Sequence, residues 1–329
     1  MKIAVVILNW NGKALLEQFL PSVLKYSHEA KIYVADNAST DGSIAYLEQS
    51  FPNVSIVKND DNYGFAGGYN QALKKIDADI FCLLNNDVEV TSGWLSPIIK
   101  HFEDHPATAI IQPKILDFKQ RDTFEYAGAA GGFIDKYGYP YCRGRLFDTL
   151  ETDQGQYNDS AEIFWASGAC FFIRAKDFEQ LGGFDDDFFA HMEEIDLCWR
   201  AFNSNLKVHY IGASTVYHLG GGTLSNLNPK KTYLNFRNGL FALTKNASGN
   251  LLFIIFIRLI LDGLAALRFL FLMQPKHVLA ILKSHLNFYS MLPKLLNERA
   301  QINQRKNYYK INSIVWRYFA LKRQSYNSL

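Results

Sequence analysis

Residues 3–12 read Ile-Ala-Val-Val-Ile-Leu-Asn-Trp-Asn-Gly, and this stretch decides the fold class. Its first six residues form a continuous apolar run with β-branched members, which is typical of a strand buried on both faces of a parallel sheet. Three further runs of this kind lie at 31–35, 54–58 and 80–84. Helix-length stretches with apolar residues three and four apart separate the runs, at 13–26, 43–50 and 67–76. The order βαβαβαβ predicts an α/β fold with a parallel sheet and right-handed crossovers.

A short polar segment follows each of these four runs. The segments are 9–12 (Asn-Trp-Asn-Gly), 36–43 (Asp-Asn-Ala-Ser-Thr-Asp-Gly-Ser), 59–68 and 85–87 (Asn-Asn-Asp). Ligands of such sheets bind at the carboxyl ends of the strands, so we expect the segments to form one polar-ligand site. A dinucleotide-binding G-x-G-x-x-G fingerprint is absent from the sequence, because Ala66 and Tyr69 take the second and third glycine positions counted from Gly64.

Composition and charge limit the class of protein. The chain has 329 residues, enough for one large domain or two modest ones. Its 48% hydrophobic and 20% charged residues exclude a mainly disordered chain. A formal net charge of +2 argues against a nucleic-acid binder that depends on bulk positive charge. The four cysteines lie far apart and the apolar run 3–8 is too short for a signal-peptide core, so we expect a cytoplasmic protein.

The pattern is weaker after the fourth strand. Residues 91–159, with many glycines and tyrosines, predict irregular loops and short antiparallel strands. A second ordered block then follows, with a strand at 168–174, a helix that starts near Met192 and a strand at 207–211. Beyond Lys230 the pattern is helical to the end of the chain.

Two carboxylates and one histidine stand at the ends of predicted strands. Asp87 suits a hard divalent cation that keeps open positions for phosphate oxygens, and a turn or helix cap is the alternative. Asp36 is placed to accept a hydrogen bond from a ligand group such as a nucleobase N–H. His218 is either structural or forms a metal-binding pair with Asp87.

Two adjacent acids, Glu193 and Glu194, fall in the first turn of the helix that starts near Met192. The helix dipole favours acids in the first turn, and this structural role accounts for one of the two glutamates. The other is left free to act as a general base beside aromatic residues that exclude water. On the same helix, Asp196 and Arg200 are four residues apart and should pair.

Taken together, the motifs resemble those of the family 2 glycosyltransferases of GT-A fold, in particular the rhamnosyltransferase-like branch. The resemblance covers about residues 1–240. The motifs that carry it occur in the family's order at 6–12, 34–43, 62–70, 83–87, 167–169, 182–185, 193–200 and His218. It implies a mixed sheet flanked by helices in a catalytic domain of residues 1–240, followed by a helical region of residues 241–329.

The resemblance also implies roles for individual residues. Those expected to bind the nucleotide-sugar donor are Asn9, Asn11, Asp36, Asn37, Ser39, Asn62, Gly64, Phe65, Asn70, Asn85, Asn86 and Arg237. Those expected around the sugar and acceptor are Trp165, Ser167, Gly168 and Ala169. Asp87 and His218 would hold a divalent metal, Mn²⁺ or Mg²⁺. Glu194 would be the general base, with Glu193 as the alternative, because the family usually has Asp where this chain has Glu194.

The implied activity is inverting, metal-dependent transfer of a sugar from a nucleotide donor to a glycan or lipid-linked acceptor in cell-surface polysaccharide synthesis. The branch points to rhamnose from dTDP-rhamnose. A UDP-hexose donor is one alternative, and a nucleotide-sugar-binding protein without turnover is another. No nucleic-acid partner is expected.

The C-terminal region contains a long apolar stretch at 251–273, interrupted by Arg258, Asp262 and Arg268. Arg258 and Asp262 are one helical turn apart and can neutralise each other. Three alternatives remain for this stretch: a helix in the membrane interface, a packing or homodimer helix, and a membrane span. The basic and aromatic tail after Lys294 suits an anionic membrane surface, with a solvated helix face as the alternative. We therefore expect a peripheral protein on the cytoplasmic face of the cell membrane.

Aromatic residues make up 15% of the chain and gather in two places. One group surrounds the predicted catalytic helix, where we expect the rings to exclude water and stack on sugars: Trp165, Phe184, Phe188, Phe189 and Trp199. The other group belongs to the candidate membrane helix: Phe253, Phe256, Phe269 and Phe271.

Overall fold

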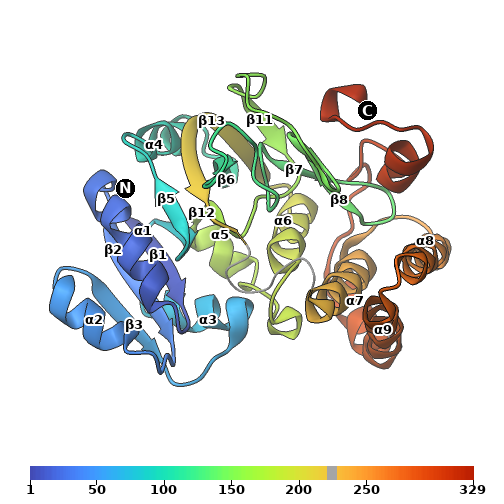
Figure 1. The fold of residues 1–329 in the computed structure, drawn as a ribbon, viewed down its shortest axis with the longest axis horizontal. Coiled ribbons are helices and arrows are strands. Elements are labelled where there is room, and N and C mark those ends of the chain that lie inside the picture. The colour runs from blue at the N-terminus through green and yellow to red at the C-terminus, as the bar shows by residue number, and fades with distance from the viewer. Residues whose placement is uncertain (221–227) are drawn as a thin grey trace.

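The computed structural model describes residues 1–220 and 228–329, and it is built around a mixed β-sheet (Figure 1). The sheet order is β11-β13-β6-β12-β4-β1-β2-β3, with β5 paired to β13. The four strands predicted first are β1 (Ile3–Asn9), β2 (Lys31–Asn37), β3 (Ser55–Asn59) and β4 (Ile80–Asn85). They pair in parallel, β4 with β1, β1 with β2 and β2 with β3, as predicted.

The other half of the sheet mixes strand directions. It consists of β5 (Val88–Val90), β6 (Thr108–Asp117), β11 (Ser160–Ile163), β12 (Cys170–Arg174) and β13 (Lys207–His218). β12 runs antiparallel to both β4 and β6, and β5 and β11 run antiparallel to β13. The expectation of a mixed sheet is therefore confirmed, because β12 reverses direction beside the parallel block.

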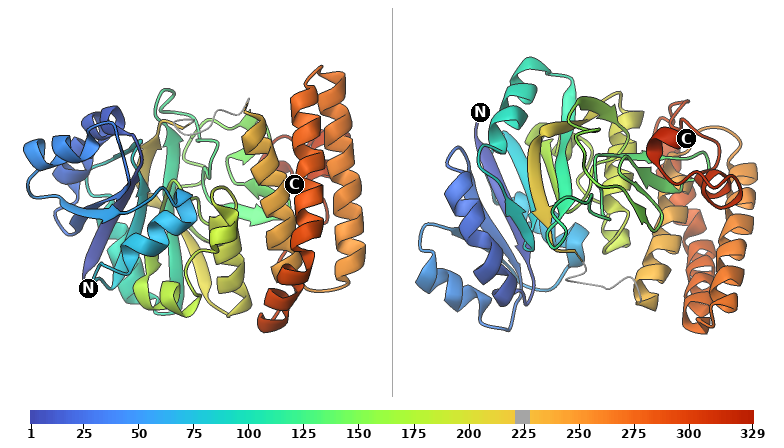
Figure 2. Two further views of the ribbon diagram at one scale, coloured as in Figure 1. Left: turned by 90° about the horizontal axis from the view of Figure 1, so that it is seen from below. Right: turned by 45° about the horizontal axis from the view of Figure 1, so that its top comes forward.

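Helices cover both faces of the sheet (Figure 2). One face packs against α1 (Lys13–Tyr26), α2 (Ser43–Ser50) and α4 (Leu95–Asp104). The other face packs against α3 (Gly64–Leu73), α5 (Ala175–Gln180) and α6 (Glu193–Asn203). The strands are apolar on both sides because both faces are buried, which is what the continuous run at residues 3–8 indicated.

The prediction of irregular structure for residues 91–159 is correct only in part. Short antiparallel strands form a second sheet: β7 (Gly132–Ile134), β8 (Pro140–Cys142), β9 (Arg145–Leu146) and β10 (Thr149–Leu150). For α4 and β6, however, the prediction is wrong. β6 lies in the middle of the main sheet although it contains Pro113 and Lys114. The register of β6 with β13 shifts after Pro113, which lets the sheet accommodate the proline. Lys114 Nζ lies 2.6 Å from Asp153 Oδ2, so the buried lysine is neutralised. A strand that looks interrupted in the sequence is therefore central in the sheet.

Three long helices follow the sheet: α7 (Pro229–Asn246), α8 (Leu251–Phe271) and α9 (Pro275–Gln301). They stand side by side along one end of the molecule in both views of Figure 2. α7 runs through the boundary expected at residue 240, and its Leu240 and Phe241 share one hydrophobic core with the sheet and with Phe288 of α9. Two short helical turns lie near the end of the chain, at Trp316–Ala320 and Tyr326–Ser328. A further short turn, a 3₁₀ turn, precedes α6 at Asp186–Phe188.

The expected ion pair of α8 forms and points inward. Arg258 Nε lies 2.8 Å from Asp262 Oδ1, and both side chains are buried. The Arg258 guanidinium also donates to the carbonyls of Tyr137 and Gly138, and Tyr139 donates to Asp262. Arg258 and Asp262 of α8 therefore face the protein, whereas Arg268 near the end of the helix is exposed. In the described parts of the chain, no helix, α8 included, has both the length and the apolar character needed to cross a membrane.

Candidate active site

The carboxyl ends of β1 and β2 meet in a buried polar network, as the sequence predicted. Asn9 and Asp36 are both fully buried, and Asn9 Nδ2 donates to Asp36 Oδ1 at 3.1 Å. The backbone N–H of Ser39 donates to the second Asp36 oxygen at 2.9 Å. Asn86, from the turn after β4, donates to Asn9 Oδ1 at 3.0 Å. Three polar segments that are far apart in sequence are thereby joined at one sheet edge.

The remaining predicted donor-binding residues on this side hold the surrounding turns. Asn11 lies over the turn after β2, where its backbone N–H donates to Ser39 Oγ at 2.9 Å. Asn37 donates to the carbonyl of Gly64 at 2.8 Å, and the Gly64 N–H donates to Asn62 Oδ1 at 3.0 Å. Gly64 has a positive φ of 70°, a conformation that favours glycine at this helix start.

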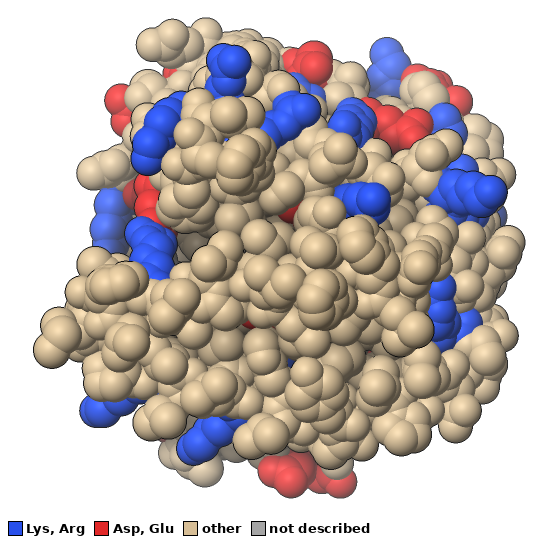
Figure 3. Space-filling model, turned by 90° about the vertical axis from the view of Figure 1, so that its right-hand side faces the viewer, with Lys and Arg blue, Asp and Glu red and all other residues tan. Residues whose placement is uncertain are grey.

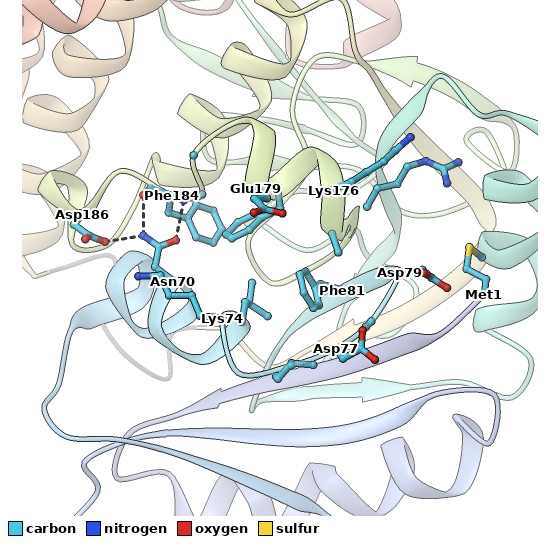
Figure 4. Close-up of a pocket in the computed structure, with 18 residues that line it drawn as sticks. Met1, Asn70, Lys74, Asp77, Asp79, Phe81, Lys176, Glu179, Phe184 and Asp186 are labelled. Atoms are coloured by element: carbon cyan, nitrogen blue, oxygen red, sulfur yellow. Dashed lines mark hydrogen bonds between the residues drawn. The ribbon is translucent and has the colours of Figure 1, made fainter.

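Asn70 joins α3 to the acidic loop that precedes α6. It donates to the Phe184 carbonyl and to Asp186 Oδ1, both at 2.8 Å, and accepts from the Phe184 N–H. Asn70 also lines a surface pocket of about 1040 Å³ at the start of β4, beside Asp79 and Phe81 (Figure 4). That pocket lies at the amino end of β4, whereas the polar segments gather at the carboxyl end.

Asp87 and His218 are brought together by strand pairing. β5 begins one residue after Asp87 and pairs with the last residues of β13, with Val88 opposite His218. His218 Nε2 lies 3.1 Å from Asp87 Oδ1 and 3.5 Å from the side-chain amide of Asn85. This arrangement offers an imidazole and a carboxylate at neighbouring strand ends, a pair of ligand types that can hold a divalent ion.

A second carboxylate, which the sequence reasoning missed, faces the other side of the imidazole. Glu125 Oε2 lies 3.3 Å from His218 Nδ1, and Glu125 is buried. Burial opposes a positive charge on His218, but the carboxylates of Glu125 and Asp87 outweigh it and raise the pKa of His218 to about 10. A carboxylate at Nδ1 also orients the ring so that Nε2 faces Asp87, and a metal ion bound there would take the place of the Nε2 proton. Nothing in the sequence around Glu125 signals this contact.

A second acidic group, Asp185, Asp187 and Glu298, is close enough to hold an ion. Two lysines already neutralise it: Lys245 pairs with Asp185 and lies 3.6 Å from Glu298, and Lys294 pairs with Asp187. We therefore expect a metal ion at Asp87 and His218, and we do not expect one at this second acidic group.

Glu193 and Glu194 begin α6, and their surroundings differ. Glu193 is buried, and burial together with the neighbouring Glu194 raises its pKa well above the usual range. Glu194 is half-buried, and burial raises its pKa to about 7, while backbone N–H groups including that of Gly168 act against the shift. A carboxylate with a pKa near 7 suits a general base at neutral pH.

The segment predicted to line the sugar pocket is mostly buried. Trp165 packs against Gly132 and donates its indole N–H to the Phe133 carbonyl at 2.8 Å. Ser167 and Ala169 are buried as well. Gly168 is half-buried and lies close to Phe65 and to the Glu194 carboxylate.

The aromatic rings predicted around α6 belong mainly to the core. Trp165, Phe184, Phe188 and Trp199 are buried, so the expectation that they stack on sugars is wrong. Phe189 is 40% exposed and is the ring of this group that faces outward. The four other rings serve to keep water from α6.

Arg237 lies on α7 and its guanidinium is engaged by the loop before α6. Its Nη2 donates to the carbonyls of Asp187 at 2.8 Å and Phe188 at 3.1 Å. Its Nε donates to the side chain of Asn238. Arg237 thus holds the backbone next to the predicted base.

Comparisons with known proteins show which family the chain resembles. The family model described as glycosyl transferase family 2 matches residues 4–182. N-acetylglucosaminyl-diphospho-decaprenol L-rhamnosyltransferase of Mycobacterium tuberculosis is 26% identical over 233 residues, which make up 65% of this chain and 75% of that protein. Rhamnosyltransferase WbbL of Escherichia coli K12 is 21% identical over 221 residues, covering 65% of this chain and 82% of WbbL.

The fold is also similar to solved glycosyltransferase structures. The crystal structure of GalNAc-T7 with UDP, GalNAc and Mn²⁺ superposes with a TM-score of 0.58 at 16% identity. The match covers 75% of this chain and 48% of that one. This likeness confirms the fold class that the sequence motifs implied.

Proposed function

This chain belongs to glycosyl transferase family 2, and from that membership we propose that it is an inverting, metal-dependent enzyme. It transfers a sugar from a nucleotide donor to a glycan or lipid-linked acceptor. The observation that carries the proposal is the turn 167–169, which joins the two halves of the chemistry. Its Gly168 N–H contacts Glu194, and the Ala169 carbonyl accepts from the N–H of Asn85 at 3.0 Å, beside Asp87 and His218.

In this proposal the residues of the chain divide the reaction between them. Asp36 and the network around it read the nucleobase. Asp87 and His218 would hold a divalent ion, which when bound would supply positive charge against the departing nucleoside diphosphate. Glu194 takes the proton from the acceptor hydroxyl while that oxygen bonds to the anomeric carbon, and the bond from this carbon to the diphosphate breaks. Attack from the opposite face inverts the configuration without an enzyme nucleophile.

The preferred donor is dTDP-rhamnose, because two of the similar proteins are named rhamnosyltransferases. A UDP-hexose is the alternative, since GalNAc-T7 was solved with UDP. A nucleotide-sugar-binding protein without turnover is disfavoured, because such a protein needs neither a base with a pKa near 7 nor a metal-type pair.

Replacing Glu194 with Gln should lower kcat by roughly two to four orders of magnitude, because general-base catalysis is lost. Nucleotide-sugar affinity should stay near that of the wild type. In the wild type, kcat should be half-maximal near pH 7 and fall at lower pH, because a protonated Glu194 cannot accept the proton. Initial rates from pH 5 to 9 and calorimetric titration of the donor measure both effects.

Glu193→Gln is the matched variant, one residue away and more deeply buried. It should keep most of the turnover and the acidic limb of the pH profile. If Glu193→Gln loses turnover while Glu194→Gln keeps it, the base is Glu193.

Replacing Asp87 with Ala should abolish the gain in nucleoside-diphosphate affinity that Mn²⁺ gives the wild type, because the ion loses its carboxylate ligand. Titration of UDP and dTDP in the presence and absence of Mn²⁺ measures this gain. Asp187→Asn, in the second acidic group, serves as the control and should keep it. The metal assignment is wrong if the two variants behave the other way round.

We also propose that the outer face of α8 and α9 binds the membrane that carries a lipid-linked acceptor. A helix of a globular protein normally turns its apolar side inward, and here the apolar side faces outward. The exposed residues recur three or four positions apart: Phe256, Ile260, Leu264, Leu267 and Phe271 on α8, and Leu279, Leu282 and Leu286 on α9.

The composition of this face favours a bilayer over a second copy of the chain. Figure 3 views the end of the molecule that carries α8 and α9, and it shows a broad area almost free of charge with Lys and Arg toward its edges. Arg268, Lys276 and Lys283 are exposed on these helices. An apolar face with a basic border fits an anionic lipid surface.

The double variant Leu264→Gln/Leu286→Gln should float less with anionic liposomes than the wild type, at equal thermal stability, because both side chains are exposed. Leu150→Gln, an exposed leucine of β10, is the control and should float like the wild type. If the wild type does not float and instead forms a dimer that the double variant disrupts, the face is a homodimer interface.

A further inference from the structure

The backbone immediately before Glu193 and Glu194 is strained. Phe189, His191 and Met192 have φ values of 61°, 68° and 73°, in the region that non-glycine residues rarely adopt. Met192 directly precedes α6, so its conformation sets the direction in which the helix starts. A turn of this kind persists only where surrounding contacts hold it.

One side chain of α7 supplies three of those contacts. The amide nitrogen of Asn238 faces three carbonyl oxygens of the turn: Phe188 at 3.0 Å, Ala190 at 3.0 Å and His191 at 2.6 Å. Asn238 is fully buried. Its oxygen accepts from Arg237 Nε at 2.8 Å, so both ends of the amide are oriented consistently, with nitrogen toward acceptors and oxygen toward a donor.

Neighbouring groups also donate hydrogen bonds to carbonyls of the same turn. Arg237 donates to Asp187 and Phe188, as described above. The backbone N–H of Phe65, at the start of α3, donates to the Phe189 carbonyl at 2.8 Å. The turn is therefore fixed between α7 and the segment 64–65 that belongs to the predicted donor site.

We propose that Asn238 is a positioning residue for the transfer reaction. By holding the carbonyls of Phe188, Ala190 and His191, it fixes the start of α6 and thereby the location of the Glu194 carboxylate. This inference rests on the proposed function for its kinetic consequences. The inference adds a requirement to the proposed function: α7 must pack against the turn before α6 for Glu194 to act as the base. α7 lies outside the region 4–182 that the family model matches.

The test compares Asn238→Asp, which keeps the shape but removes the donors, with Asn238→Gln, which keeps an amide donor. Asn238→Asp should lower kcat about a hundredfold, since small displacements of a reacting group have effects of that order. It should change the donor KM little and shift the pH midpoint of kcat. Asn238→Gln should recover part of kcat. Amide hydrogen exchange of residues 187–192 should be faster in Asn238→Asp, and this readout needs no turnover.

Thr232→Val is the control on the same helix, because it removes a buried hydrogen bond to His277 and leaves the turn untouched. Arg237→Gln is a second variant that loosens the turn if Asn238→Asp does not fold. The proposal is overturned if exchange at 187–192 stays at the wild-type rate, or if kcat falls no more than in Thr232→Val. Wild-type protein without any transfer would instead contradict the proposed function, and the exchange result would still stand.

Discussion

The pairing of β5 with the end of β13 is the contact around which the site is assembled. It sets Val88 opposite His218 and so places the preceding Asp87 against the imidazole. The metal-type pair is therefore fixed by backbone hydrogen bonds, and flexible side chains play little part in it. Because β4 leads directly into this turn, the same geometry aligns Asn85 and Asn86 with the ends of β1 and β2. The arrangement of the predicted donor-binding residues is a consequence of sheet register.

The proposed base depends on the different surroundings of the carboxylates on α6. Burial alone would raise the pKa of Asp196, but Lys245 and Arg200 outweigh it and hold that pKa below its usual value. For Glu193 and Glu194, burial is the largest effect, and it raises the pKa of both carboxyl groups. One helix thus carries a structural carboxylate that stays charged and a pair that can exchange protons. Asp196 anchors α6 to Lys245 and Asn246 of α7. Because this contact uses Asp196, it does not neutralise Glu194, the proposed base.

Much of the fold and the donor edge could be predicted from the sequence, because the parallel strands are continuous apolar runs and each is followed by its polar segment. The pairs Asp196–Arg200 and Arg258–Asp262 followed from helical spacing. β6 was missed because Pro113 lies at a register shift that exists only in three dimensions. Glu125 and Asn238 act through contacts with residues far away in the chain, so no local pattern could reveal them. Side-chain burial was the other gap, since a Trp or Phe near the site looks the same in sequence whether it packs in the core or faces a ligand.

The central claim is that the carboxyl edge of the sheet binds a nucleotide sugar together with a divalent ion. Thermal unfolding of the full chain with a panel of dTDP-, UDP- and GDP-sugars, each with and without Mn²⁺, tests it most directly. A ligand at a free concentration of about 100 times its Kd adds about 2.7 kcal/mol to the free energy of unfolding, which corresponds to a rise of several degrees in Tm. We predict such a shift for at least one sugar nucleotide, larger with Mn²⁺ than without. If no sugar nucleotide raises Tm under either condition, the account is contradicted.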